Sequence, residues 1–309
     1  MYPSFTPPLH PFPGARAADS PSQCHAAMFA APHGTPYPGI DNRVHADSGS
    51  AIRAAVAEDA RWLSHWDFDL DGDLLAGRDD FRLGDLGDLH TSPQDGPGNR
   101  AKIEQATAAV LAAGAVPIMI GGDDSVPIPF IAGFAGAGPL TILQIDAHID
   151  WRDQRRGERL GFSSTMRRAS EMPHVERIIQ VGMRGTGSAR AEEVRQAQAW
   201  GAQFVPARRI HAEGVNAALG LVPAGTRVLI SLDLDALDGA IMPAVISPTP
   251  GGLNYWHVID LIAGVAAKAR IAGMDVIEFV PERDHPNQFA AYTAGRILMH
   301  LIGQLARHI

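Results

Sequence analysis

The feature of this sequence that most limits its fold is the alternation of short apolar segments with longer helix-like segments. The apolar segments lack regular polar alternation, so we predict strands that are buried on both faces. The predicted strands are residues 25–31, 116–120, 140–145, 177–181, 203–205, 228–235 and 271–279. The predicted helices are residues 103–113, 191–200, 255–269 and 288–307, the third with Asn254 as its N-cap. Such a pattern is typical of an α/β protein whose central parallel sheet is covered by helices on both faces.

The N-terminal segment differs in composition from the rest of the chain. Six of the 23 prolines lie within the first 21 residues. Because proline disfavours the interior of helices and sheets, we predict that residues 1–23 form an extended arm that lies on the body of the protein or on a neighbouring subunit. Residues 24–309 are predicted to form a single domain.

Charge and cysteine content limit the classes of binding partner and the cellular compartments that we expect for this protein. The chain has 26 basic and 34 acidic residues, a formal charge of −8, which disfavours broad attraction to nucleic acid or to an anionic membrane. The single cysteine forms no intramolecular disulfide, and no secretory leader or transmembrane helix is predicted. We therefore expect a cytoplasmic protein.

Three of the predicted strands run directly into acidic residues. They end in the sequences GGDDS (121–125), DAHID (146–150) and DLD (233–235). The carboxyl ends of parallel strands meet at one edge of the sheet, so these groups should converge. Clustered carboxylates repel one another and lose hydration unless cations neutralise them. The sequence therefore predicts a divalent metal site. Where the chain stays extended, period-two spacing places alternate residues of each motif on one side.

The predicted ligands indicate which metals the site prefers. Many carboxylate oxygens with one imidazole favour a hard ion, with Mn²⁺ as the first choice and Ni²⁺ as the alternative. This number of carboxylates favours two ions over one. Paired ions lower the pKa of a bridging water and supply hydroxide near neutral pH, so the predicted chemistry is hydrolysis.

In these motifs the chain resembles the ureohydrolase family, which includes arginases, agmatinases and guanidino-acid hydrolases. The resemblance extends from about residue 25 to the C-terminus and rests on GGDDS, DAHID, SLDLDALD, PTPGG (248–252) and DVIE (275–278), in the family's order. It implies a three-layer α/β arginase-like fold, two Mn²⁺ ions and a homo-oligomer, either a trimer or a hexamer. It also implies hydrolysis of a guanidinium group to urea and an amine.

The resemblance further implies roles for individual residues. The implied metal ligands are Asp146 and Asp233 bridging both ions, Asp124 and Asp150 on one ion, and His148 and Asp235 on the other. Glu278 would bind the guanidinium, and its carboxylate suits a planar cation with several N–H donors. Asp150 would also relay a proton to the departing amine.

Two positions depart from the family's usual pattern. Asp124 stands where the family usually has a metal-binding histidine, so five aspartates bring −5 against +4 from two ions. Phe162 stands where the family usually has a histidine that transfers protons, which a phenyl ring cannot do. We assign Phe162 to the substrate pocket together with Trp151, a candidate to stack on a planar amidine. The four arginines between residues 152 and 159 are candidates for loop salt bridges or for binding a substrate carboxylate.

The leading hypothesis is an agmatinase-like hydrolase that acts on a small cationic guanidino compound. Two alternatives stay open. One is a catalytically weak subunit of a hetero-oligomeric guanidine or biguanide hydrolase, assembled with an active paralogous subunit, which the departures at Asp124 and Phe162 suggest. The other is a single-metal deacetylase, which two bound ions per chain would exclude.

Overall fold

A single mixed sheet of ten strands organises residues 3–309, the part of the chain that the computed structural model describes. The strands are β1 (Phe5–Thr6), β2 (Ala15–Ala17), β3 (Ala26–Ala31), β4 (Leu83–Leu89), β5 (Val116–Gly121), β6 (Leu140–Ile145), β7 (Val175–Val181), β8 (Gln203–Val205), β9 (Arg227–Asp233) and β10 (Arg270–Ile277). Their order is β1-β4-β3-β5-β10-β9-β6-β7-β8, and β2 also pairs with β4. Every pairing is parallel except that of β1 with β4, so the predicted α/β class with a central parallel sheet is confirmed.

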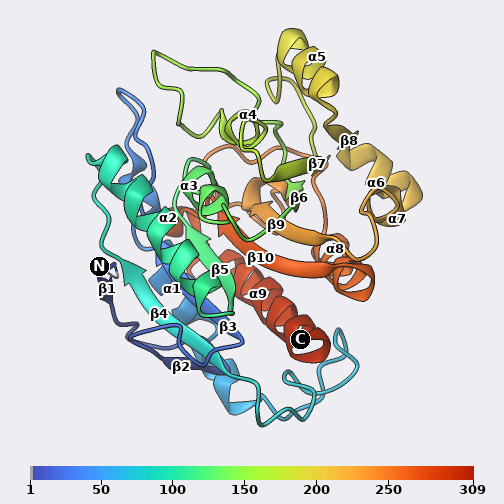
Figure 1. Ribbon diagram of the computed structural model, residues 1–309. Coiled ribbons are helices and arrows are strands. Elements are labelled where there is room, and N and C mark those ends of the chain that lie inside the picture. Colours follow the sequence, from blue (N-terminus) through green and yellow to red (C-terminus); the bar gives the residue numbers. More distant parts are fainter. Residues whose placement is uncertain (1–2) are drawn as a thin grey trace.

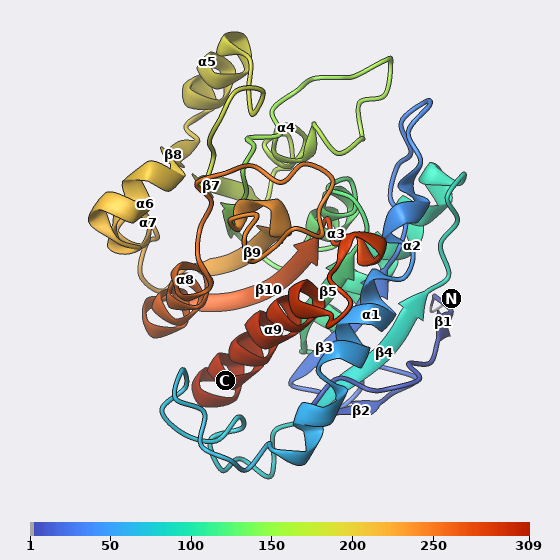
Figure 2. The ribbon, with the colours of Figure 1, turned by 180° about the vertical axis from the view of Figure 1, so that it is seen from behind.

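Helices cover both faces of this sheet and complete three layers. They are α1 (Ser48–Ala55), α2 (Gly96–Ala112), α3 (Pro127–Ala132), α4 (Thr165–Ala169), α5 (Ala191–Trp200), α6 (Ala207–Glu213), α7 (Asn216–Leu219), α8 (Tyr255–Lys268) and α9 (Phe289–His308). Short 3₁₀ helices are η1 (Asn42–His45), η2 (Ala57–Arg61), η3 (Leu234–Ala236) and η4 (Pro281–Arg283). Helices α2 and α3 lie in front of the sheet in Figure 1, and α1, α8 and α9 lie in front of it in Figure 2.

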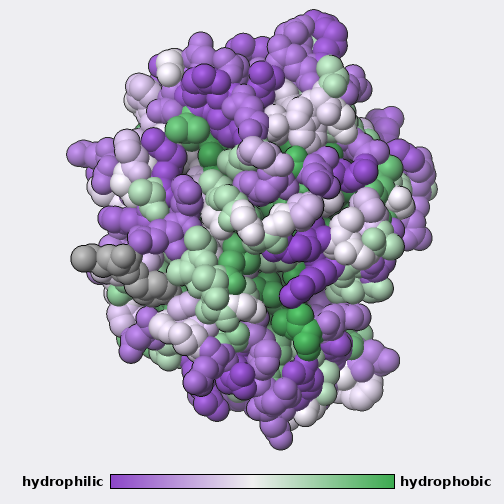
Figure 3. Space-filling model, in the orientation of Figure 1, coloured by the Kyte–Doolittle hydropathy of each residue, from purple (hydrophilic) through white to green (hydrophobic). Residues whose placement is uncertain are grey.

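The core consists of two apolar clusters, one on each face of the sheet. In β6, Leu143 and Ile145 belong to the cluster that contains α1, α8 and α9, whereas Leu140 and Ile142 belong to the cluster that contains α2 and α3. Successive side chains of a strand point to opposite faces, so a strand buried on both must be apolar throughout. On the outside, Figure 3 shows mainly hydrophilic residues around a smaller central group of hydrophobic ones.

The structure confirms every predicted strand and helix, and shifts several of their ends. The main difference is at residues 228–235, where strand β9 ends at Asp233 and η3 follows. Asn254 caps α8 by accepting a hydrogen bond from the His257 amide at 2.8 Å. Strands β1, β2 and β4 and helices α1, α3, α4, α6 and α7 were outside the sequence prediction.

Both short strands of the proline-rich segment pair with β4. Residues 15–17 run parallel to residues 83–85, and residues 5–6 run antiparallel to residues 88–89. The Phe12 amide also donates to Asp85 Oδ2 at 3.1 Å. The arm is thus tied to the sheet of its own chain. Among residues 3–309, no helix is long and apolar enough to cross a membrane.

Candidate metal centre and active site

Four adjacent strands at the centre of the sheet, β5, β10, β9 and β6, deliver the acidic motifs to one edge. Asp124 follows β5, Glu278 follows β10, Asp233 ends β9, and the motif at residues 146–150 follows β6. These parallel strands place their carboxyl ends side by side, as expected for the ligand-binding edge of such a sheet. Residues far apart in the sequence therefore meet in one place.

A cavity of about 380 Å³ lies at this edge. The acidic and imidazole groups that line it include Asp124, His148, Asp150, Asp233, Asp235 and Glu278. Asp146 lies beneath them and is 1% exposed. The structure thus brings together all six predicted ligands and the carboxylate predicted to face the substrate.

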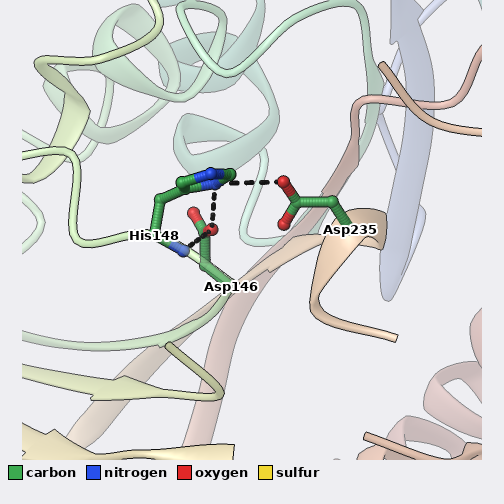
Figure 4. Close-up of side chains that lie close together, drawn as sticks. All are labelled: Asp146, His148 and Asp235. Atoms are coloured by element: carbon green, nitrogen blue, oxygen red, sulfur yellow. Dashed lines mark hydrogen bonds and ion pairs between the residues drawn. The ribbon is translucent and has the colours of Figure 1, made fainter. Parts of the chain in front are cut away.

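The candidate ligands form two groups that share Asp146. Oxygen atoms of Asp124, Asp146 and Asp233 lie within 4.8 Å of one another, and so do ligand atoms of Asp146, His148 and Asp235. In the second group, His148 Nδ1 lies 3.0 Å from Asp235 Oδ2 and 3.4 Å from Asp146 Oδ1. Figure 4 shows these three side chains pointing toward one another.

The two Asp-x-His and Asp-x-Asp motifs reach this geometry through turns. The chain does not stay extended through the first motif, since β6 ends at Ile145 before the motif begins. Instead, Asp146 Oδ1 accepts the His148 amide at 2.6 Å, and Asp233 Oδ1 accepts the Asp235 amide at 2.7 Å. Aspartate favours such turns because its short side chain reaches the amide two residues on. In each motif the turn joins the carboxylate of the first residue to the amide of the third, and in the first motif it also leaves His148 Nδ1 3.4 Å from Asp146 Oδ1.

Asp150 is held by a buried glutamine that the sequence analysis missed. Gln144 Nε2 donates to Asp150 Oδ2 at 2.9 Å and to Asp146 Oδ2 at 2.7 Å, and its own carbonyl accepts a hydrogen bond from Gln180. The two glutamines are paired in register on β6 and β7. A polar residue one position before the end of each of two apolar strands is the signal that would have found them.

Burial and mutual repulsion dominate the electrostatics of the cavity floor. Burial raises the pKa of Asp124 well above its ordinary value of 3.8, and the charges of Asp150, Asp146 and Glu278 raise it further. The same two effects raise the pKa values of Asp150 and Asp233. The floor is therefore costly to ionise without added positive charge.

His148 supplies a proton and a positive charge in direct contact with this floor. Burial opposes its charge, but hydrogen bonds and charges of Asp146 and Asp235 raise its pKa to about 12. The proton on His148 lies between those two carboxylates and gives them the positive charge that a metal ion would otherwise provide. Metal binding there must release this proton.

The donor set fits divalent ions. Asp124 Oδ2 is buried and has no hydrogen-bond partner among the described residues, which is expensive for a carboxylate oxygen unless a cation binds it. Clustered carboxylate oxygens with one imidazole suit hard ions and exclude metals that need thiolates. We therefore regard the two groups as a candidate metal centre.

Glu278 lies on the wall above the candidate ligands. Its backbone is left-handed, with φ of 67°, and its Oε1 accepts the Asp124 amide at 2.9 Å. Burial raises the pKa of Glu278 to about 7, although His45 lowers it. His45 Nε2 lies 3.6 Å from Glu278 Oε2, while its Nδ1 contacts the Phe279 carbonyl oxygen at 2.9 Å. His45 comes from the distant helix η1, and no local sequence pattern connects it to the site.

The two predicted aromatic residues occupy different environments. Trp151 borders the cavity, but it is 1% exposed and packs against Trp200 with ring centroids 5.9 Å apart, so its indole belongs to the core. Phe162 lines the cavity and packs edge-to-face against Tyr37, with the two ring centroids 4.6 Å apart. The structure therefore supports Phe162 as a wall residue and gives Trp151 no open face for stacking.

Comparisons with known proteins agree with this architecture. The sequence profile of the Arginase family matches residues 32–303. The N(1)-aminopropylagmatine ureohydrolase of Thermus thermophilus is 36% identical over 195 residues, which covers 62% of this chain and 64% of that relative. The alignment thus spans less than two thirds of the relative's length.

Solved structures extend the likeness over nearly the whole chain. The agmatine ureohydrolase of Thermoplasma volcanium is 26% identical, with a TM-score of 0.75 and coverage of 93% of this chain and 92% of that one. The proclavaminate amidino hydrolase of Streptomyces clavuligerus is 26% identical, with a TM-score of 0.75 and coverage of 100% and 98%. The profile match over residues 32–303 and these shared folds show that the chain belongs to the Arginase family.

Proposed function

We propose that this chain is a metal-dependent hydrolase that cleaves a C–N bond of a guanidino or amidine compound and releases urea, or a urea-like product, and an amine. The observation that carries the proposal is the convergence of five aspartates and one histidine with Glu278 at a single cavity. The names of the relatives, which are agmatine-type ureohydrolases and an amidino hydrolase, support the same chemistry.

The metal would contribute positive charge and an activated nucleophile. Two divalent ions, with Mn²⁺ as the first choice and Ni²⁺ as the alternative, would lower the pKa of a water molecule in the cavity and polarise the substrate. Asp146, shared by both ligand groups, would hold the two sites at a fixed separation. Asp124 would bind the metal through Oδ2, which has no hydrogen-bond partner among the described residues.

The remaining residues bind the substrate and move a proton. Glu278 would accept N–H groups of the guanidinium, since its carboxylate is fixed by the Asp124 amide and a fork-shaped acceptor matches a planar cation. Asp150 Oδ2, oriented by Gln144, would receive a proton from the attacking water and deliver it to the departing amine nitrogen.

The test is urea release by the purified chain alone, loaded with Mn²⁺ or Ni²⁺, across guanidino compounds headed by agmatine. We expect turnover in the wild type and a loss of at least about 10²-fold in Asp233→Asn. Asp79→Asn, which changes an exposed aspartate, serves as the matched control. Metal analysis should find two ions per chain.

Other outcomes would contradict the proposal in different ways. One ion per chain would favour the single-metal deacetylase. Two ions without turnover of any compound would favour the catalytically weak subunit, and adding a paralogous partner would then restore activity.

A further inference from the structure

The loop between β6 and α4 carries four arginines, and the side chains of three of them bond to acceptors in the loop itself or elsewhere in the protein. Their partners are Glu193 Oε1 at 3.3 Å from Arg152 Nε, the Pro38 carbonyl oxygen at 2.7 Å from Arg156 Nη1, and Asp153 Oδ1 at 3.2 Å from Arg159 Nη2. Of these three, Arg152 also lines the cavity, but its charge is paired with that of Glu193. The fourth, Arg155, is different.

The Arg155 guanidinium lies over two aromatic rings, that of Phe162 in the cavity wall and that of Tyr37, which packs against Phe162. Its Cζ is 5.4 Å from the centroid of Tyr37 and 5.6 Å from that of Phe162. Within residues 3–309, no carboxylate forms an ion pair with it and no acceptor binds its side-chain N–H groups. Contact with a ring occupies a face of the guanidinium, whereas its five N–H donors point outward in its plane. Arg155 thus borders the cavity as a cation with unused donors.

The residues that line the cavity therefore carry charges of both signs. Carboxylates among them include Asp150, Asp233 and Glu278, and Arg155 adds a guanidinium with no ion-pair partner among residues 3–309. A cationic head group suits the carboxylates. A second cationic group beside Arg155 would be repelled, whereas a carboxylate there would accept two parallel hydrogen bonds.

We propose that Arg155 binds a carboxylate at the far end of the substrate, so that the chain prefers guanidino acids over guanidino amines. This inference rests on the proposed hydrolysis and sharpens its substrate class away from the agmatinase-like expectation. It also gives Phe162 a function: the ring supports Arg155 in the position where the family pattern has a histidine. Arg155 is in this sense a specificity residue with no part in the bond-breaking step.

The experiment compares three substrates that differ at one end. They are 4-guanidinobutyrate with a carboxylate, propylguanidine with a methyl group, and agmatine with an ammonium group. We expect kcat/KM of the wild type to fall in that order. Arg155→Met, which keeps much of the side chain's length without its charge, should lower kcat/KM for 4-guanidinobutyrate about 10- to 100-fold, the usual loss for one charge-assisted hydrogen-bond pair. It should leave propylguanidine within about threefold.

Two further variants separate charge at this position from general damage to the loop. Arg155→Glu should reverse the preference so that agmatine exceeds 4-guanidinobutyrate. Arg159→Met removes a neighbouring arginine of the same loop that is exposed and bonded to Asp153, and it should leave the order of the three substrates unchanged. Equal losses for all three substrates in Arg155→Met would overturn the inference, because a structural role does not distinguish their tails.

Calorimetric binding keeps this test separate from the test of hydrolysis. If no compound releases urea, the proposed function fails, but the affinities for 4-guanidinobutyrate still decide the role of Arg155. A Kd that Arg155→Met raises at least about tenfold supports the carboxylate site. An unchanged Kd rules it out.

Discussion

Two clusters of carboxylates in this protein, each with buried members, differ in how their negative charge is compensated. On β4, Asp85 is fully buried and accepts Arg53 Nε at 2.8 Å, and Asp88 accepts the Nη1 of the same guanidinium at 2.6 Å. At the cavity floor, five aspartates share a single imidazole, and Asp124 Oδ2 has no partner among the described residues. The fold therefore supplies its own cation in one place and leaves the other short of positive charge.

This difference shows how structural and functional acids can be told apart. Burial costs a carboxylate several kcal/mol, about the same in either cluster, unless a cation compensates it. In the Arg53 cluster, Asp85 accepts hydrogen bonds from the Arg53 guanidinium and from the amides of Phe12 and Gly87. These bonds hold α1 and the N-terminal arm against β4. An acidic cluster without such a partner is a site prepared for a cation that comes from outside.

The largest effect is expected from removing the built-in cation. Arg53→Met should lower the free energy of unfolding by about 3–5 kcal/mol, because Asp85 stays buried without its counter-charge. Urea denaturation of the metal-free protein measures it. Adding Asp85→Asn should recover part of the loss. A loss below about 1 kcal/mol would show that the two clusters do not differ as described.

The next effect is the response to metal. Mn²⁺ at 100 to 1,000 times its Kd should raise the free energy of unfolding by about 2.7–4.1 kcal/mol, since it binds the folded state alone. Thermal melts with Mn²⁺ and with a chelator measure this shift. Arg53→Met should keep the response if it folds, whereas Asp233→Asn should lose it. The same shift in both variants would place the metal elsewhere.

A smaller effect with the opposite sign is expected at the cavity floor. Without metal, Asp124→Asn should stabilise the protein by about 1–2 kcal/mol, because it removes one buried charge from a repelling group. The raised pKa of Asp124 means that the folded state holds its proton longer than the unfolded state. The gain should therefore be absent below pH 3.8 and grow as pH rises above it.

Metal should reverse this result. In saturating Mn²⁺ the wild type should be the more stable protein, because Asp124→Asn loses a ligand. Urea titrations at several pH values, with chelator and with Mn²⁺, test both signs. If Asp124→Asn destabilises the metal-free protein as much as Asp85→Asn does, both acids are structural.

The smallest effect comes from an ion pair that is exposed. Arg209 Nε lies 2.9 Å from Glu213 Oε2 on α6, with about half of each side chain accessible. Arg209→Gln should change the free energy of unfolding by at most about 0.5 kcal/mol. Urea denaturation of both variants measures this change. If Arg209→Gln lowered the free energy of unfolding as much as Arg53→Met does, burial would not explain why the two ion pairs differ in strength.

The sequence predicts the parts of the fold that follow from local patterns. Strand β6 and helix α5 have the predicted bounds because their apolar runs and helical period continue unbroken between clear ends. Strand β4 does not show this pattern, since glycine and aspartate interrupt LGDLGDL. Its aspartates are stable in the sheet only because Arg53 of α1 reaches them, and such a contact between distant segments has no local signature.

The residues of the candidate site also fall into those that local sequence patterns predict and those that depend on tertiary packing. Acids that follow apolar strands were predictable, because parallel strands bring their ends together. The turns that orient His148 and Asp235, and the neighbours His45 and Tyr37 from remote loops, depend on tertiary packing. The contacts that pair Arg152 with Glu193 and leave Arg155 without an ion-pair partner, within residues 3–309, depend on it too.

The pairing of both arm strands with β4 has a consequence for solubility. Without the arm, the outer edge of this seven-residue strand would offer free backbone groups to any other extended chain, which is a common route to aggregation. Gly87, with φ of 85°, permits the close approach of the Thr6 carbonyl that closes this edge. Two prolines follow at positions 7 and 8, and proline has no amide hydrogen to donate to a further strand. The composition that makes this segment a poor strand former thus makes it an effective end to the sheet.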